Sequence, residues 1–290
     1  WGSDTWHDDE SFERKAHLAD LARTVDDLSR EFPEAERLFD FVKHWLTEIN
    51  SIGGTGWGTP QIFVSALIQK RADFAKIVMA RQGDVQSPLS RFAGAALAVL
   101  MVDPNRHALI AELLDTDSPR AWELVSEAYA RQAGDFFTEA DLVIVRRIFL
   151  SHEPMVLNHA AAIARQIAAK YPPLAVELIC TADLGASPGA THDFFMWLAH
   201  RDTSPSEAIT KPQWEVLIQR LARLRELDDH WVRAFVKKAV AAHPGEVIKM
   251  LQARLLEGAR NFAFRALRRD RKGVGLALLS HPDGLTLLRD

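Results

Sequence analysis

Apolar residues recur every three or four positions along most of the chain, and short breaks at proline or glycine separate the runs. This spacing is typical of amphipathic helices. Two helices are expected first, over residues 11–31 and 33–50, and a third follows over 60–82. No stretch alternates with period two and no Asn-Gly turn occurs, so no strand is predicted. The further helices are expected over residues 88–102, 104–115, 118–132, 138–150, 153–170, 172–182, 190–200, 212–225, 229–242 and 244–258.

Proline separates two apolar helices at four places, which are Pro104, Pro172, Pro212 and Pro244. The segments 160–179 (AAAIARQIAAKYPPLAVELI) and 232–251 (VRAFVKKAVAAHPGEVIKML) nearly superpose around two of these prolines. Self-similarity with a period of roughly 30–45 residues indicates helical hairpins that stack into a solenoid. We therefore predict an all-α fold, an α-solenoid of about six to seven stacked antiparallel helix pairs.

One of these hairpins resembles a HEAT repeat. Its residues are Asp229-His230-Trp231-Val232-Arg233-Ala234, then a break at His243-Pro244, then Val247, Ile248 and Leu251. The stretch 88–258 as a whole resembles a HEAT-like α-solenoid, although a polar loop at 201–211 makes the period irregular. The resemblance implies a curved scaffold with an extended groove for proteins or nucleic acids.

The phrase Trp231-Val232-Arg233 is also similar to one in the HEAT-like DNA alkylation-repair glycosylases. That resemblance implies recognition of damaged DNA by aromatic and basic side chains in a cleft. Trp231 also falls on the apolar stripe of its helix, which favours a packing role for it.

The cluster Ser51–Pro60 (SIGGTGWGTP) is the longest run of helix-breaking residues and marks the expected domain boundary. We predict an N-terminal helical pair with a glycine-rich linker over residues 1–58, and a HEAT-like solenoid with a short C-terminal cap over 59–290. The cluster lacks the Gly-Lys-Ser/Thr ending of a phosphate-binding loop. Trp57, within it, is either a loop anchor or an exposed contact residue.

The composition is that of an ordinary globular protein, with 48% hydrophobic and 26% charged residues among 290. A single cysteine excludes an internal disulfide framework, and no apolar run reaches 18 residues. We expect a cytoplasmic location and no membrane contact. Because the chain begins with Trp1, we also expect a piece of a larger polypeptide.

Charge is unevenly distributed along the chain. Residues 211–290 hold 16 Lys/Arg against 9 Asp/Glu, whereas residues 1–210 hold 19 against 30. If residues 260–272 are helical, four basic side chains share one face, which suits a polyanion or an acidic partner. A solvated face, or pairing with an acidic part of the same protein, is the alternative. The candidate basic contacts are Arg254, Arg260, Arg265, Arg268, Arg269 and Lys272.

Four large apolar residues in a row, Phe194–Trp197, cannot all face one core. Some of them must meet a neighbouring repeat or a partner. Phe194 and Trp197 are therefore candidate contact residues, together with Trp57, wherever they prove exposed.

No catalytic or metal-binding pattern stands out. His152 and His159 are seven positions apart, and His192 and His200 are eight apart, so neither pair has the spacing that zinc favours on a helix. Cys180 lies on an apolar helix face, where thiols are usually inert.

We therefore predict no cofactor and a non-enzymatic protein-interaction scaffold, the sensor or regulatory region of a larger intracellular protein. Its partner would be another protein or other domains of the same polypeptide. The alternative is a nucleic-acid-binding HEAT-like solenoid of DNA-repair type, and an enzymatic role stays open.

Overall fold

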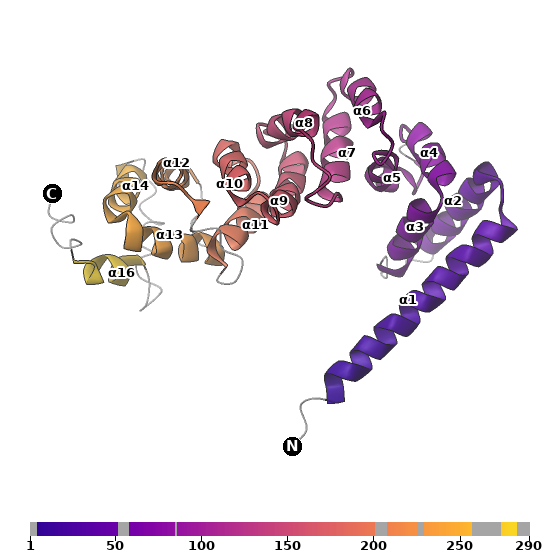
Figure 1. Ribbon diagram of the computed structural model, residues 1–290, viewed down its shortest axis with the longest axis horizontal. Helices are drawn as coiled ribbons and strands as arrows, with labels where there is room; N and C mark the ends of the chain where they lie inside the picture. Colours follow the sequence, from indigo (N-terminus) through magenta and orange to yellow (C-terminus); the bar gives the residue numbers. More distant parts are fainter. Residues whose placement is uncertain are drawn as a thin grey trace. The chain divides into compact units, whose positions relative to one another are not determined.

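The computed structural model describes residues 5–51, 58–84, 86–200, 208–224, 229–256 and 274–282. Throughout these ranges the regular structure is helical, without a strand, which confirms the all-α class (Figure 1). The chain divides into two compact units, Trp1–Asp117 and Ser118–Asp290.

The first unit contains six α-helices among its described residues. In this unit α2 packs on α4, α4 packs on α5, and both α1 and α5 contact α3. The expected boundary at residues 58/59 therefore lies inside this unit, because helices on both sides of it share contacts. The helices are α1 (Thr5–Glu31), α2 (Ala35–Ser51), α3 (Gly58–Lys70), α4 (Ala72–Ala80), α5 (Ala93–Leu100), which follows a 3-10 turn at Ser90–Phe92, and α6 (Arg106–Leu114).

The single helix expected over residues 60–82 is wrong, because the chain breaks between α3 and α4 at Arg71. Arg71 has extended backbone angles, φ −120° and ψ 90°. Its guanidinium donates hydrogen bonds to the carbonyl oxygens of Phe32 and Pro33, at 3.2 and 2.8 Å, just beyond the end of α1. The last carbonyls of a helix have no partner within it. Arg71 supplies one for Ser29, in the last turn of α1, whose carbonyl oxygen lies 3.4 Å from Nη1 of Arg71. It thus fastens the end of α1 to the start of α4.

The helices of the second unit pack in two series. In one, α7, α9, α11, α13 and α16 contact each other in succession, and in the other α8, α10, α12 and α14 do the same (Figure 1). Contacts such as α7 with α8 and α9 with α10 join the two series. The helices are α7 (Pro119–Ala130), α8 (Glu139–Phe149), α9 (Pro154–Ala168), α10 (Pro172–Thr181), α11 (Pro188–Ala199), α12 (Lys211–Ala222), α13 (His230–Ala242), α14 (Pro244–Leu256) and α16 (Val274–Ser280).

Helix starts in this unit follow local rules that the sequence displays. Proline opens α7, α9, α10, α11 and α14, where its missing N–H costs nothing. Thr138 and Asp141 form a capping box at the start of α8: the Thr138 N–H donates to the Asp141 carboxylate at 2.8 Å, and the Asp141 N–H donates to Oγ1 of Thr138 at 3.4 Å. Asp141 is buried and also accepts a hydrogen bond from the Tyr129 hydroxyl at 2.9 Å.

Helix α9 is central to the second unit, since it contacts α7, α8, α10 and α11. Small side chains permit this close approach. Four of them are buried, Ala160, Ala161, Ala164 and Ala168. The loop after α7 also comes close to α9: a Cβ at Gly134 would collide with the carbonyl oxygen of Gln166. Glycine is therefore required at that position by space.

Candidate functional site

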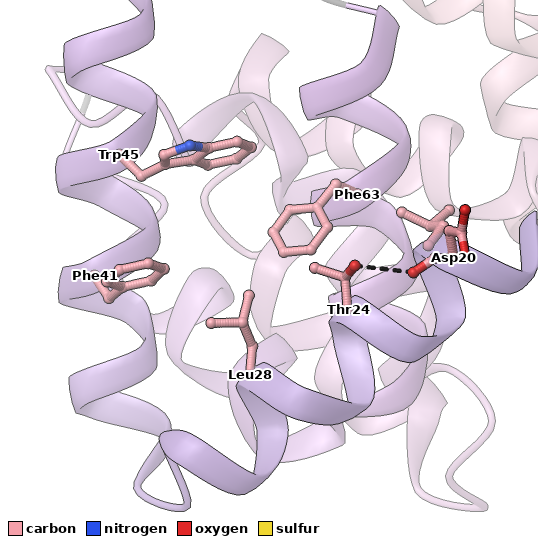
Figure 2. Close-up of a pocket in the computed structure, with 7 residues that line it drawn as sticks. Asp20, Thr24, Leu28, Phe41, Trp45 and Phe63 are labelled. Atoms are coloured by element: carbon pink, nitrogen blue, oxygen red, sulfur yellow. Dashed lines mark hydrogen bonds between the residues drawn. The ribbon is translucent and has the colours of Figure 1, made fainter. Parts of the chain in front are cut away.

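A pocket of about 350 Å³ lies among the first three helices (Figure 2). This volume is near the lower end of the range for ligand pockets. Apolar side chains form most of its wall. The lining residues are Asp20, Leu21, Thr24 and Leu28 from α1, Phe41 and Trp45 from α2, and Phe63 from α3.

Aromatic rings shape the pocket, and one of them, Phe41, stays partly open to solvent. Trp45 and Phe63 meet edge to face with their centroids 5.3 Å apart. Phe41 stacks on Phe32 at 4.7 Å, yet 38% of Phe41 is exposed. Leu18, which is 50% exposed, lies one turn before Leu21 on α1. Folding thus leaves apolar surface beside the pocket uncovered, and such surface is typical of an interaction site.

The polar groups of the pocket are few. Thr24 donates its hydroxyl proton to the backbone oxygen of Asp20 at 2.9 Å, within α1. Asp20 is the one charged residue among those that line the pocket. Its carboxylate lies 3.5 Å from Nη2 of Arg23, and these two side chains are 72% and 71% exposed. Exposed pairs of this kind contribute little, about 0–1 kcal/mol, so a second cation can compete for the carboxylate.

In the second unit, two histidine–aspartate pairs connect neighbouring helices. Nδ1 of His152 lies 2.8 Å from the Asp183 carboxylate, and Nδ1 of His192 lies 2.5 Å from that of Asp229. The hydrogen bond from His152 lowers the pKa of Asp183. Burial opposes ionisation of Asp229. Hydrogen bonds from His192 and from two backbone N–H groups outweigh that burial, so the pKa of Asp229 also falls below its ordinary value.

In the first pair, the His152 side chain is exposed. In the second pair, Asp229 caps α13, because its carboxylate accepts hydrogen bonds from the N–H groups of Trp231 and Val232 at 2.7 and 3.0 Å. Both pairs thus have a structural explanation. Within the described ranges, no three His, Cys, Asp or Glu residues are grouped closely enough to hold a metal ion.

Burial also perturbs two further titratable side chains of the second unit. Burial raises the pKa of the Cys180 thiol to about 11, so it stays protonated and unreactive at neutral pH. Burial also lowers the pKa of His159, although Glu127 and Glu123 act in the opposite direction. Neither group is among the residues that line the pocket.

Arg254, predicted as a surface contact, lies in the core with 1% of its surface exposed. Its Nη1 donates to the carbonyl oxygens of Leu221 and Ala222 at 2.9 and 3.2 Å, and to that of Leu224. These carbonyls end α12, where a cation also meets the negative end of the helix dipole. Arg254 therefore caps a helix and is not accessible to a partner.

The other predicted contact residues divide into two groups. Phe194 is 2% exposed and packs near Phe149, with centroids 5.9 Å apart, so it belongs to the core. Trp197 is half-buried on the same helix. Trp57, Arg260, Arg265, Arg268, Arg269 and Lys272 lie outside the described residues.

Sequence reasoning missed a feature that repeats. Arg220 on α12 donates to the carbonyl oxygen of Ala182, the residue that ends α10, just as Arg254 on α14 caps α12. The two arginines occupy matching segments, LIQRL at 217–221 and LQARL at 251–255. That match was the signal available in the sequence. Arg220 thus joins α12 to α10, and Arg254 joins α14 to α12.

Comparison of the chain with protein-family models, with curated proteins and with solved structures finds no match. No helix in the described ranges combines the length and the apolar character needed to cross a bilayer.

Proposed function

We propose that the chain is a non-enzymatic protein-interaction scaffold, an α-solenoid whose pocket among α1, α2 and α3 receives an apolar side chain of a protein partner. The observation that carries the proposal is the pocket itself. Leu21, Leu28 and three aromatic residues form a recess that remains open in the folded unit, with Phe41 partly exposed at it. Aromatic and apolar recesses of this kind are where interfaces concentrate their binding energy.

The solenoid part of the proposal rests on the second unit. Each helix from α7 to α12 contacts the helix two positions later in the chain, as α7 contacts α9 and α8 contacts α10. This is the pattern expected of stacked hairpins. Arg220 and Arg254 add the same side-chain link at two successive steps. A chain of equal steps would produce the extended surface that the HEAT-like resemblance implies.

The pocket chemistry favours binding over catalysis. Its polar side-chain groups are the Asp20 carboxylate, which is exposed, the Thr24 hydroxyl, which donates within its own helix, and the indole N–H of Trp45. An activated nucleophile needs an adjacent base. Thr24, the one hydroxyl among the lining residues, donates to a backbone oxygen and not to a base.

The alternative function, nucleic-acid binding by a HEAT-like solenoid of repair type, depends on the basic stretch 254–272. Arg254 is its one charged side chain within the described residues, and it is buried against α12. Trp231, of the repair-like phrase, is half-buried beside His200 and His230, with centroids 5.7 and 4.9 Å away. The geometry therefore adds no support to this alternative.

Site-specific photocrosslinking tests the proposed function. A benzophenone amino acid replaces Phe41 in the full chain, and the same probe replaces Val143 as a control, since Val143 is 59% exposed on α8 of the other unit. We expect a protein crosslinked from Phe41 that is lost when Trp45→Ala is added, and no such product from Val143.

The proposal would be refuted if Trp45→Ala did not reduce crosslinking from position 41, or if crosslinking from positions 41 and 143 were equal. Circular dichroism of the Trp45→Ala protein shows whether the helices are intact. If they are not, Thr24→Trp, which blocks the pocket from an exposed lining position, repeats the comparison without removing a core side chain.

A further inference from the structure

The acidic charge of the first unit is concentrated in the segment that forms most of the pocket. Residues 1–51 contain 13 Asp/Glu and 6 Lys/Arg, whereas residues 52–117 contain 6 of each. The whole excess of seven negative charges therefore belongs to the segment that includes α1 and α2. A field of that sign attracts cationic partners and repels nucleic acids and anionic membranes.

Acidic side chains also lie close to the pocket itself. Asp20 lines it, and Asp27 lies one turn beyond Thr24 on the same helix. Glu48 lies three residues after Trp45 on α2, with its side chain 62% exposed.

The cationic partners of the two aspartates are exposed and local. Asp20 pairs with Arg23 at 3.5 Å, and Asp27 pairs with Arg30 at 2.7 Å. Each of these cations lies three residues further along α1, and the side chains are at least 59% exposed. Such pairs rearrange at small cost when a partner brings its own cations.

We infer that the partner segment is basic: it presents one large apolar side chain with Lys or Arg within one helical turn of it. This inference rests on the proposed function and names the class of partner for the same pocket. The apolar side chain enters among Leu28, Phe41 and Trp45, and the cation reaches the Asp20 carboxylate. A cation near the exposed part of Phe41 gains a further contribution from its ring. Hydrophobic burial supplies the affinity, and charge selects the partner.

Three synthetic helical peptides of about 15 residues, each with the same apolar anchor, test the inference. Their flanking positions carry Lys, Gln or Glu. Binding to the full chain is measured by fluorescence anisotropy at about 50 mM and about 300 mM salt.

We expect the Lys peptide to bind about tenfold more tightly than the Gln peptide at low salt, and the Glu peptide to bind more weakly than both. The preference for Lys should shrink at high salt, because exposed charges are screened. Asp20→Asn should weaken the Lys peptide about two- to fivefold and leave the Gln peptide unchanged, as expected for one exposed pair. Asp135→Asn, an exposed carboxylate of the other unit, is the matched control and should change neither.

The outcomes separate this inference from the proposed function. Equal or tighter binding of the Gln or Glu peptide, still abolished by Trp45→Ala, overturns the basic partner and keeps the pocket as a binding site. If no peptide binds, or if Trp45→Ala has no effect on any of them, both proposals fail. Sedimentation of the protein without peptide gives the remaining outcome. If the protein self-associates and Trp45→Ala restores the monomer, a second copy of the chain is the occupant of the pocket and the inference is overturned.

Discussion

Replacement of Arg254 by Met should destabilise the second unit strongly, although the sequence places Arg254 beside a basic surface stretch. The guanidinium is 1% exposed, and its Nη1 donates to the carbonyl oxygens of Leu221, Ala222 and Leu224. Met keeps much of the side-chain length but offers no donor. The carbonyls at the end of α12 would then be buried without this partner.

The size of the effect follows from the hydrogen bonds. Nη1 carries two N–H groups, and a hydrogen bond from a charged donor contributes about 1.5–3 kcal/mol net. Removal of the buried charge recovers part of that loss, because its desolvation no longer opposes folding. We expect the free energy of unfolding to fall by about 2–4 kcal/mol, and Tm by about 10 °C for a unit of this size. Arg254→Lys keeps the charge but loses the planar fork, so its cost should be about half.

Urea denaturation with hydrogen exchange, read helix by helix, measures this effect. In Arg254→Met, amides of α12 and α14 should exchange faster, while those of α2 and α4 in the other unit stay protected. Arg223→Met is the matched control, because Arg223 is exposed just after α12, and its cost should stay within about 0.5 kcal/mol. If Arg254→Met matched this control, the assignment of Arg254 as a buried cap would be refuted.

Three further predictions concern the second unit. The lowered pKa of Asp229 means that it stabilises the fold above the ordinary value of 3.8 and loses this contribution as pH falls through its lower folded value. Urea midpoints should therefore show Asp229→Asn and wild type differing at pH 7 and converging at strongly acidic pH, and an unchanged gap would contradict this. Burial of neutral His159 lowers its pKa, so stability should decline as pH drops below 6.5, and His159→Leu should lessen the decline between about pH 7 and about pH 5. Gly134→Ala should lower Tm measurably, because its Cβ would collide with the carbonyl of Gln166, and a neutral result in calorimetry would show that the loop shifts freely.

Local rules made most helices of this chain predictable from sequence. The prolines that open α9, α10 and α14 stand at the predicted starts, within one residue, and the capping box of α8 is formed by residues three positions apart, Thr138 and Asp141. Each of these signals depends on residues only a few positions apart, so it can be recognised directly in the sequence. The alanines of α9 are equally informative, since small side chains on several faces require close neighbours.

Features that depend on distant contacts were not visible in the same way. Arg71 ends α3 because it reaches the carbonyls beyond α1, about 40 residues earlier, and no local signal in an apolar run reveals that contact. Arg254 looked like part of a basic face because charge in sequence says nothing about burial against another helix.

The pocket could not be read from sequence for a related reason. Phe41, Trp45 and Phe63 were not among the predicted contact residues, and the space between them depends on how three helices meet. The consecutive residues Phe194–Trp197 attracted notice instead, although Phe194 proves to be core.

The most direct test of the account is the indole N–H resonance of Trp45 in the full, ¹⁵N-labelled chain during titration with the Lys peptide. The resonance is assigned from its loss in Trp45→Phe, and Trp214, buried in the second unit, serves as an internal reference. We expect the Trp45 resonance to shift as peptide is added and to reach its final position when binding is saturated, while the Trp214 resonance does not move. A bound peptide that leaves Trp45 unmoved would show that the pocket is not where the partner binds.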